Sequence, residues 1–348
     1  MMPTPTWTFT SPRWTKNSTR LATLCPAWAT PATANLGRAD LRSASSSQQV
    51  GWADSLLVLT TVFWAVNFSM VKFALVELPP LAFNGLRMLL AAGLMLALVP
   101  ALGYSLKFQR HHLGRLLILG LLGNTSYQLC FIFGIARTTA DNAALILATV
   151  PAWVALIGTL AGTEKITAGG WLGVLLSLAG ISLIVLGGSH QAQLQFGGTT
   201  LPGDALILGA TLCWSLYTLV SRRLLRDYSP IAVTSFTTAV GIIPLVILAI
   251  PPLLQLEWGS VSLTAWGSLV FSAVFGITLA YFFWNFGVSR LGSTRTSLYS
   301  NLTPPLALLT AWLLLGETMT LLQLGGGLLA LAGVALARRY TYAVKKPD

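Results

Sequence analysis

Residues 56–83 read LLVLTTVFWAVNFSMVKFALVELPPLAF, and residues 206–233 read LILGATLCWSLYTLVSRRLLRDYSPIAV. The two stretches match at a constant spacing of 150 positions: Trp64 with Trp214, Lys72 with Arg222 and Pro80 with Pro230. Further on, residues 133–167 match residues 286–320 at a spacing of 153, which pairs Pro151 with Pro304 and Glu164 with Glu317. Gly173 and Gly180 then match Gly326 and Gly333. Several motifs match, and the spacing between the matched stretches changes only from 150 to 153 positions. This pattern indicates an internal repeat.

The composition predicts an integral membrane protein. Hydrophobic residues make up 54% of the chain, charged residues make up 9%, and the mean hydropathy is +0.71. A soluble domain devotes about a quarter of its residues to charged side chains, so this chain lacks the means to cover a water-facing surface. The three cysteines form no motif that would predict a disulfide framework or a metal site.

Apolar runs long enough to span a bilayer follow one another from Gly51 onward, each of about 20 residues. They predict an all-α polytopic membrane protein with ten transmembrane helices, at 54–76, 81–99, 113–135, 139–160, 168–187, 204–224, 231–249, 264–288, 294–315 and 321–338. Each half of the repeat holds five helices. Because five is odd, the second half enters the membrane from the opposite side, and the fold is predicted as two inverted five-helix repeats.

The predicted domain organisation follows these runs. Residues 1–50 contain no apolar run and are predicted to form a disordered tail, although a start codon placed too far upstream would look the same. Residues 51–187 form the first repeat, 188–203 an outer linker, 204–339 the second repeat and 340–348 a short C-terminal tail.

The Lys and Arg residues predict the orientation. If both termini are cytoplasmic, eighteen of the 21 fall in cytoplasmic segments, and the 188–203 linker has none. This is the positive-inside pattern of a cell-membrane protein. The net charge of +11 therefore reflects topology, and nucleic acid is not expected as a partner.

Aromatic and amide side chains recur on single faces of several predicted helices. Such a stripe favours a wet cavity for a small amphipathic ligand, whereas single Ser and Thr residues more often hold helices together. The predicted substrate-binding residues are Trp64, Asn67, Asn124, Tyr127, Gln128, Trp214, Tyr217, Trp284, Asn285, Tyr299 and Asn301.

Two cations lie within predicted helices and are candidates for a gate or charge role. Lys72 lies close to the outer end of its helix, where snorkelling to the headgroups explains it as well as a cavity role does. Arg87 lies deeper in the next helix, and we expect it to face inward, in a structural or an anion-binding role.

Acidic residues and histidines fall at helix ends, in loops and in tails. A buried proton relay therefore has no obvious carrier, and the sequence favours facilitated diffusion or coupling through a group near a gate. No metal cluster or phosphate-binding loop occurs, so no cofactor is predicted, and an ATP-driven pump is disfavoured.

Trp64, Asn67 and Lys72, the stretch PPLAFNGLR with Arg87, and TTADNAALILATVPAWVAL followed by Glu164 together resemble the EamA family of the drug/metabolite transporter superfamily. The resemblance covers about 51–339 and recurs in both halves, except that Thr237 stands where a match to Arg87 would be. It implies ten helices in two repeats and export of amino acids or related metabolites.

The sequence therefore predicts a secondary transporter of small metabolites, working by alternating access, and not an enzyme. A channel-like facilitator and, less favoured, a lipid-modifying membrane enzyme stay as alternatives. The glycine-rich helices at 168–187 and 321–338 lack polar stripes and are predicted to serve close packing or a homodimer interface.

Overall fold

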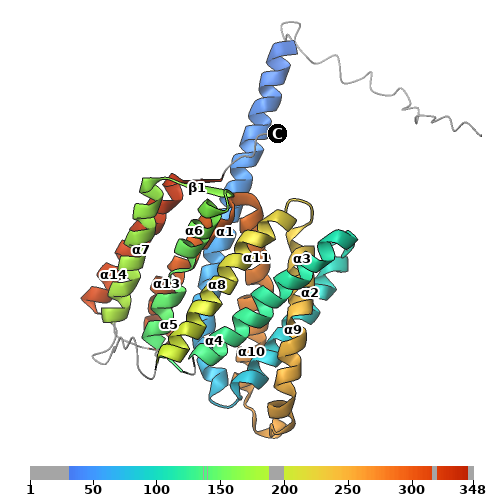
Figure 1. The fold of residues 1–348 in the computed structure, drawn as a ribbon, viewed down its shortest axis with the longest axis vertical. Coiled ribbons are helices and arrows are strands. Elements are labelled where there is room, and N and C mark those ends of the chain that lie inside the picture. The colour runs from blue at the N-terminus through green and yellow to red at the C-terminus, as the bar shows by residue number, and fades with distance from the viewer. Residues whose placement is uncertain (1–30, 136, 139, 188–199, 316–319, 344–348) are drawn as a thin grey trace, which may run out of the picture. The chain divides into compact units, whose positions relative to one another are not determined.

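The structure is a computed structural model that describes residues 31–135, 137–138, 140–187, 200–315 and 320–343 (Figure 1). It is a nearly all-helical bundle. Residues 51–343 contain eight helices that are long and apolar enough to cross a membrane, counted over the described ranges. Those that run unbroken after the first are α2 (Pro80–Ala101), α7 (Ala168–Gly187), α8 (Leu201–Leu224), α9 (Pro230–Leu254) and α14 (Leu321–Tyr340).

The first helix, α1, runs from Pro31 to Leu75, and its candidate span begins at Gly51. Residues 31–50, which the sequence analysis placed in a disordered tail, are helical in the structure, and the predicted division into a tail and a first repeat stays a prediction. Proline can occupy the first turn of a helix, and no further proline follows until Pro79, so nothing in the backbone stops the helix earlier. Residues 1–30 lie outside the described part of the chain.

The third helix of each repeat contains a wider, π-helical stretch at an equivalent place. In the first repeat, α3 (Arg110–Gly120) continues through η2 (Leu121–Ser126) into α4 (Tyr127–Ile135). In the second, α10 (Leu263–Phe271) continues through η4 (Ser272–Leu279) into α11 (Ala280–Leu291). Short π-helical segments within α-helices are often found at functional sites.

The fourth helix of each repeat is broken. The predicted helix 139–160 is α5 (Ala140–Leu147) followed by α6 (Val150–Leu160), with Pro151 in the first turn of α6. The predicted helix 294–315 is α12 (Ser293–Ser297), the 3₁₀ turns of η5 (Leu298–Leu302) and α13 (Thr303–Leu315). Proline removes a backbone donor and clashes with the preceding turn, which accounts for the breaks before Pro151 and Pro304.

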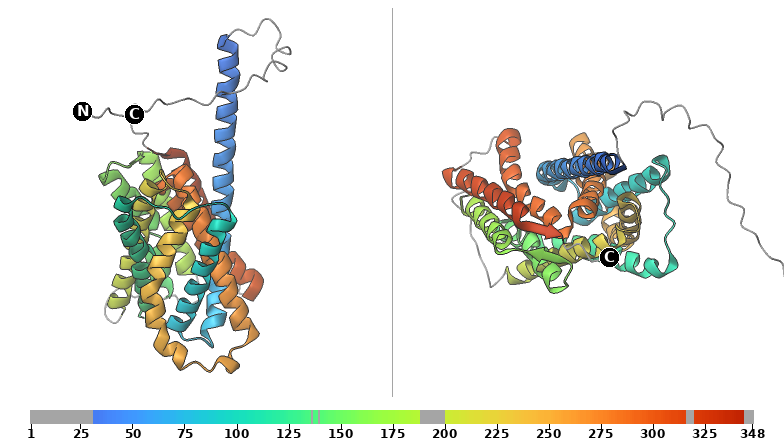
Figure 2. Two further views of the ribbon diagram at one scale, coloured as in Figure 1. Left: turned by 90° about the vertical axis from the view of Figure 1, so that its right-hand side faces the viewer. Right: turned by 90° about the horizontal axis from the view of Figure 1, so that it is seen from above.

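The glycine-rich helices α7 and α14 pack along each other, as the view from above in Figure 2 shows. A Cβ atom added at Gly180 would lie 2.3 Å from the backbone nitrogen of Ala330, and one added at Gly333 would lie 2.3 Å from that of Ser177. Glycine is needed here because the two backbones approach so closely. These glycines therefore serve packing within the chain, and a homodimer through them stays a prediction.

A two-stranded antiparallel sheet, absent from the sequence prediction, joins the two repeats. Strand β1 (Glu164–Ile166) pairs with β2 (Thr341–Ala343), so the predicted C-terminal tail begins as a strand. Residues 344–348 and most of the 188–203 linker lie outside the described residues. A short 3₁₀ turn, η3 (Trp258–Ser260), precedes α10.

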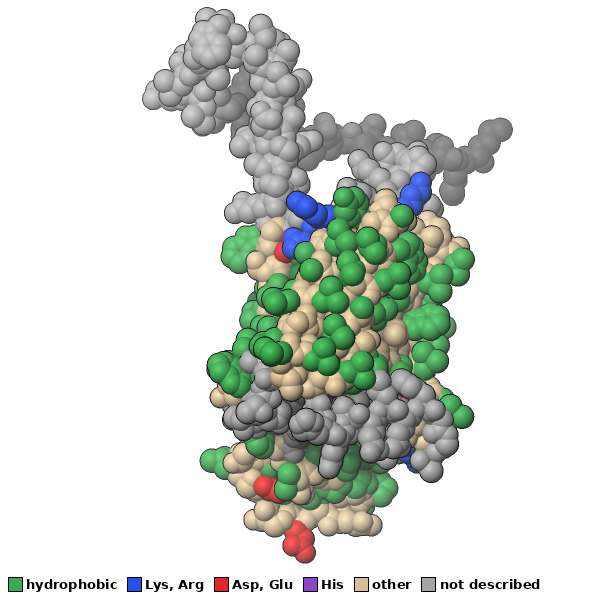
Figure 3. All heavy atoms as spheres, turned by 90° about the vertical axis from the view of Figure 1, so that its left-hand side faces the viewer, with side chains coloured by type: hydrophobic (Ala, Val, Ile, Leu, Met, Phe, Trp, Pro, Cys, Tyr) green, Lys and Arg blue, Asp and Glu red, His purple; other side chains and the backbone are tan. Residues whose placement is uncertain are grey.

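The surface agrees with a membrane environment. Large apolar side chains such as Val76, Leu160 and Leu328 are at least 70% exposed, and hydrophobic side chains cover the face shown in Figure 3 between its two ends. We call the end that carries Arg222, Arg295 and Arg338 the basic end; it lies at the top of Figure 1.

Candidate functional site

Aromatic side chains from both repeats meet in the middle of the bundle. Trp214 on α8 is the centre of this aromatic cluster: its ring lies 6.1 Å from that of Trp64, 5.6 Å from Trp284 and 5.2 Å from Tyr127. Tyr217 and Tyr281 each lie 5.3 Å from the same indole. Five residues that the sequence analysis assigned to the site from four different helices are thus brought together: Trp64, Tyr127, Trp214, Tyr217 and Trp284.

Hydrogen bonds fix the orientation of these rings. The indole of Trp64 donates to the carbonyl of Gly276 in η4 at 3.1 Å, and that of Trp284 donates to Thr218 Oγ1 at 3.3 Å. Asn285 Nδ2 donates to Tyr217 Oη at 2.8 Å and to Thr234 Oγ1 at 2.9 Å. The aromatic cluster is therefore held in place by partners on α8, α9 and η4.

Arg87 on α2 lies beside this cluster and is 8% exposed. Its guanidinium donates to Asn84 Oδ1 at 2.9 Å, to Ser272 Oγ at 3.2 Å and to Gln128 Oε1 at 3.3 Å. Gln128 also shares a side-chain hydrogen bond with Tyr281, which connects Arg87 to the aromatic cluster. Among the described residues no carboxylate forms an ion pair with Arg87, so its charge meets only neutral partners: these hydrogen-bond acceptors and the ring of Phe83, whose centroid lies 5.1 Å from its Cζ.

Several buried polar atoms around this centre have no hydrogen-bond partner among the described residues. Asn84 Nδ2 is a free donor next to Arg87, while Asn67 Oδ1 and Asn285 Oδ1 are free acceptors. A Cβ atom at Gly276 would lie 2.8 Å from Asn67 Oδ1, so this oxygen rests against η4. Buried polar groups are nearly always paired, and unpaired ones point to a missing partner such as a bound molecule.

Three predicted site residues lie apart from this centre. Asn124 donates to the carbonyl of Thr237 at 3.2 Å and so joins η2 to α9. Tyr299 donates to Asp54 Oδ1 at 2.6 Å, and Asn301 donates to Ser177 Oγ at 2.8 Å. All three connect helices, and the side chain of Lys72 lies outside the described residues.

At the basic end, ion pairs join the two repeats. Glu164 Oε1 accepts from Arg222 Nη1 at 2.5 Å and from the backbone nitrogen of Ser293 at 3.0 Å. Asp54 pairs with Arg338 and lies 3.8 Å from Arg295. Burial raises the pKa of Glu164 above its ordinary value, and Arg222 offsets only part of that effect. All three salt bridges found among the described residues belong to this end.

At the opposite end of the bundle, the two repeats are joined by hydrogen bonds of Glu77 to Ser262. The carboxylate of Glu77, just after α1, accepts from the backbone nitrogen of Ser262 at 2.6 Å and from its hydroxyl at 2.7 Å. These hydrogen bonds lower the pKa of Glu77, because they stabilise its charged form. Glu77 is exposed, so water competes for the same contact.

Three residues with contacts to the predicted site residues were not predicted from the sequence: Asn84 and Ser272, which accept from Arg87, and Asp54, which accepts from Tyr299. Asn84 precedes Arg87 by three positions, a spacing that places two side chains on one helix face, and that signal could have found it. Ser272 and Asp54 carry no such signal, because they reach their partners across the bundle. No group of three potential metal ligands occurs in the part of the chain that the structure describes.

The sequence profile of the EamA-like transporter family matches residues 51–186 and 201–339, which together make up most of the chain. The chain belongs to this family. It contains two EamA domains, one in each half, and it is therefore a multi-pass membrane transporter and not an enzyme.

Similar proteins agree with this family assignment. The uncharacterized transporter YyaM of Bacillus subtilis is 26% identical over 81% of this chain and 92% of its own length. A probable amino-acid metabolite efflux pump of Salmonella typhimurium is 28% identical over 80% and 92%, and a probable terminal-alkyne amino-acid exporter of Streptantibioticus cattleyicolor is 27% identical over 83% and 93%. A solved crystal structure has a similar fold, with a TM-score of 0.71 and 18% identity, covering 82% of this chain and 96% of that one.

Proposed function

We propose that this EamA transporter moves small amphipathic metabolites that carry a carboxylate, most of all amino acids, out of the cell by alternating access. The observation that supports this best is Arg87, a buried cation with only neutral partners among the described residues. A cation in the membrane interior is costly and is normally paired or functional. A solute carboxylate would supply the missing negative charge.

The unpaired polar atoms support a zwitterionic solute. Asn84 Nδ2 can donate to a carboxylate that also binds Arg87, and bidentate capture of this kind suits the flat guanidinium. The free oxygens of Asn67 and Asn285 can accept from an ammonium group. The rings of Trp64, Trp214 and Trp284 offer π faces to the apolar part of the solute and to its cation.

The membrane arrangement that fits this function has ten spans in two inverted repeats, with both termini in the cytoplasm of a cell-membrane protein. The broken fourth and ninth helices then count as spans, and the basic end faces the cytoplasm by the positive-inside rule. In this arrangement, Glu164–Arg222 and the Asp54 pairs close the cytoplasmic side. The names of the Salmonella and Streptantibioticus relatives favour amino-acid export.

Transport by purified protein in lipid vesicles tests the role of Arg87. Labelled amino acids should be exchanged in counter-flow, which only a carrier supports, and in preference to the amines that lack the carboxylate. Arg87→Gln should abolish this preference, and Arg87→Lys should retain part of it. Arg290→Gln is the matched control, because Arg290 is an exposed cation that lies over Phe286.

If Arg87→Gln lowered the transport of amino acids and of amines to the same degree, Arg87 would have a structural role only. That result would contradict the proposal. Asn67→Leu tests the other end of the solute. It should weaken discrimination between an amino acid and the corresponding acid without an ammonium group, while leaving the preference over the amine intact.

A further inference from the structure

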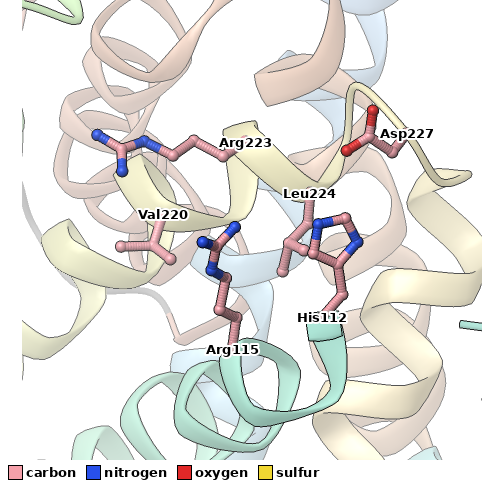
Figure 4. Close-up of a pocket in the computed structure, with 6 residues that line it drawn as sticks. All are labelled: His112, Arg115, Val220, Arg223, Leu224 and Asp227. Carbon is pink, nitrogen blue, oxygen red and sulfur yellow. The ribbon is translucent and has the colours of Figure 1, made fainter. Parts of the chain in front are cut away.

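A pocket of about 220 Å³ opens at the basic end, between the start of α3 and the end of α8. We call it the α3–α8 pocket; its lining is His112 and Arg115 from the first repeat and Val220, Arg223, Leu224 and Asp227 from the second. Figure 4 shows the guanidinium of Arg115 pointing from α3 toward α8. The pocket is smaller than the roughly 300–1,000 Å³ typical of sites for drug-sized ligands, and it lies away from the aromatic cluster.

The polar part of the lining is mainly basic. Arg115 and Arg223 are exposed and line the pocket from opposite repeats; in Figure 4 the side chain of Arg223 extends along α8. His112 is held by a contact of 2.9 Å between its Nδ1 and the hydroxyl of Tyr228, which also accepts from the backbone nitrogen of Gln109 at 3.1 Å. Asp227 is the one acid in this lining. Two guanidinium groups at the mouth of a small pocket suit a phosphate, which they bind through several charge-assisted hydrogen bonds.

Below the charges, the same helix faces are apolar. On α8, Val220 and Leu216 lie three and seven positions before Arg223, on the face that Arg223 shares, and they are 38% and 36% exposed. On α3, Ile118 lies three positions after Arg115 and is 67% exposed. A basic mouth above an exposed apolar strip matches a lipid, with its headgroup at the membrane surface and its chains along the helices.

We propose that the α3–α8 pocket binds the phosphodiester headgroup of an anionic phospholipid, with its acyl chains lying along Ile118, Val220 and Leu216. Basic pockets between transmembrane helices on the cytoplasmic side are suited to such headgroups. Because Arg115 and Arg223 belong to different repeats, the bound phosphate bridges them and stabilises the conformation that is closed at the basic end. This proposal is independent of which solute the transporter carries.

Native mass spectrometry of the purified full chain, with phosphatidylglycerol or phosphatidylcholine added, tests it directly. The wild type should retain phosphatidylglycerol more strongly. Arg115→Gln and Arg223→Gln should each weaken this retention by about fivefold, the effect of one charge near an anionic lipid. Arg339→Gln is the control, because Arg339 is an exposed cation in the last turn of α14 that does not line the pocket.

Val220→Trp tests whether lipid retention depends on the shape of the apolar wall as well as on the charge of the pocket. The indole would occupy the apolar wall while both arginines stay, so phosphatidylglycerol retention should fall although the net charge is unchanged. The apparent melting temperature in phosphatidylglycerol compared with phosphatidylcholine should show the same order among the variants, since a ligand of the folded state raises stability.

Three results would overturn the proposal. Arg339→Gln could weaken retention as much as the two pocket variants, which would indicate a general charge effect. Val220→Trp could leave retention unchanged. Finally, millimolar glycerol 1-phosphate could displace the lipid and raise the melting temperature equally well, in which case the pocket binds a soluble phosphate and not a phospholipid.

Discussion

Helices α2 and α9 occupy equivalent positions in the two repeats, yet only α2 carries a charge. Arg87 of α2 bonds to Ser272 in η4, the π-helical stretch of the second repeat. At the matching place, Thr237 of α9 accepts through its backbone carbonyl from Asn124 in η2, the π-helical stretch of the first. Each helix thus meets the π-helical stretch of the opposite repeat, but one hydrogen bond has a charged donor and the other joins two neutral groups.

This difference indicates that the repeats share their architecture but differ in charge at the proposed binding site. Around Arg87 the partners are amide and hydroxyl oxygens, whereas the hydroxyl of Thr237 donates to the backbone carbonyls of Val233 and Thr234 on its own helix. A solute that bound at the pseudo-symmetry axis would therefore meet a cation on one side only. We infer that the asymmetry orients the solute, with its carboxylate toward the first repeat.

The largest expected effect comes from placing a charge on α9. Thr237→Arg would bury a cation at a position that is 0% exposed, without the oxygens that surround Arg87. We expect a loss of about 4–6 kcal/mol in stability from the buried charge and the overpacking together. The yield of monodisperse protein in detergent and its melting temperature measure this. Thr237→Val is the control for loss of the hydroxyl.

If Thr237→Arg were as stable as the wild type, the second repeat would accommodate a cation as well as the first does. The difference in charge between α2 and α9 would then not reflect a difference in the free-energy cost of a buried cation.

A smaller effect is expected where the repeats share one ion pair, Glu164 with Arg222. Arg222→Gln leaves a carboxylate that is 2% exposed without its cation, at a cost of about 3–5 kcal/mol. Glu164→Gln should cost less, because the Arg222 side chain is 17% exposed and can be hydrated. Melting temperatures of the two variants give the comparison.

The pH dependence of Arg222→Gln follows from the pKa of Glu164, which burial already raises above its ordinary 4.5. Loss of Arg222 raises this folded-state pKa further. A carboxyl group with a raised pKa contributes stability below its unfolded pKa and loses that contribution as the pH rises through the folded value. The variant should therefore approach wild-type stability in acid and fall behind toward neutral pH. A cost independent of pH would show that Glu164 is not the group left unpaired.

Much of this asymmetry was predictable from the residues. The offset of 150 that pairs Arg87 with Thr237 is visible in the sequence, as are the aromatic faces that place Trp64, Trp214 and Trp284 together. Periodicity works for these residues because α1, α8 and α11 are regular helices there. The inward direction of Arg87 was expected from the cost of a deep charge in lipid, and the side chain is buried; its role in a gate or in anion binding stays a prediction.

Periodicity says less about partners where the helix is not α-helical. Asn124 lies in η2 and Gln128 just after it; Asn124 donates to α9, whereas Gln128 accepts from Arg87 on α2, and the shared face expected for them stays a prediction. Tyr299 lies in the 3₁₀ turns of η5 and points to Asp54. The β1–β2 pairing gave no signal, because three-residue strands are too short for an alternating pattern.

The smallest expected effect lies where the repeats behave alike, at the contact between α7 and α14. Gly180→Ala would place a methyl group 2.3 Å from the backbone of Ala330 and should force the helices apart, at a cost of about 1–3 kcal/mol. Gly325→Ala, on the adjoining helix, has no atom within 4 Å of the new Cβ. Both changes gain the same helix propensity, so the difference in their melting temperatures measures the effect of the close approach between the backbones.

Gly333→Ala should match Gly180→Ala, because the two glycines are equivalent in the repeat and an added Cβ atom at each would lie 2.3 Å from a backbone nitrogen. If the two differed as much as Gly180→Ala and Gly325→Ala do, the repeats would be asymmetric in packing as well as in charge. The difference between α2 and α9 would then extend beyond the proposed binding site.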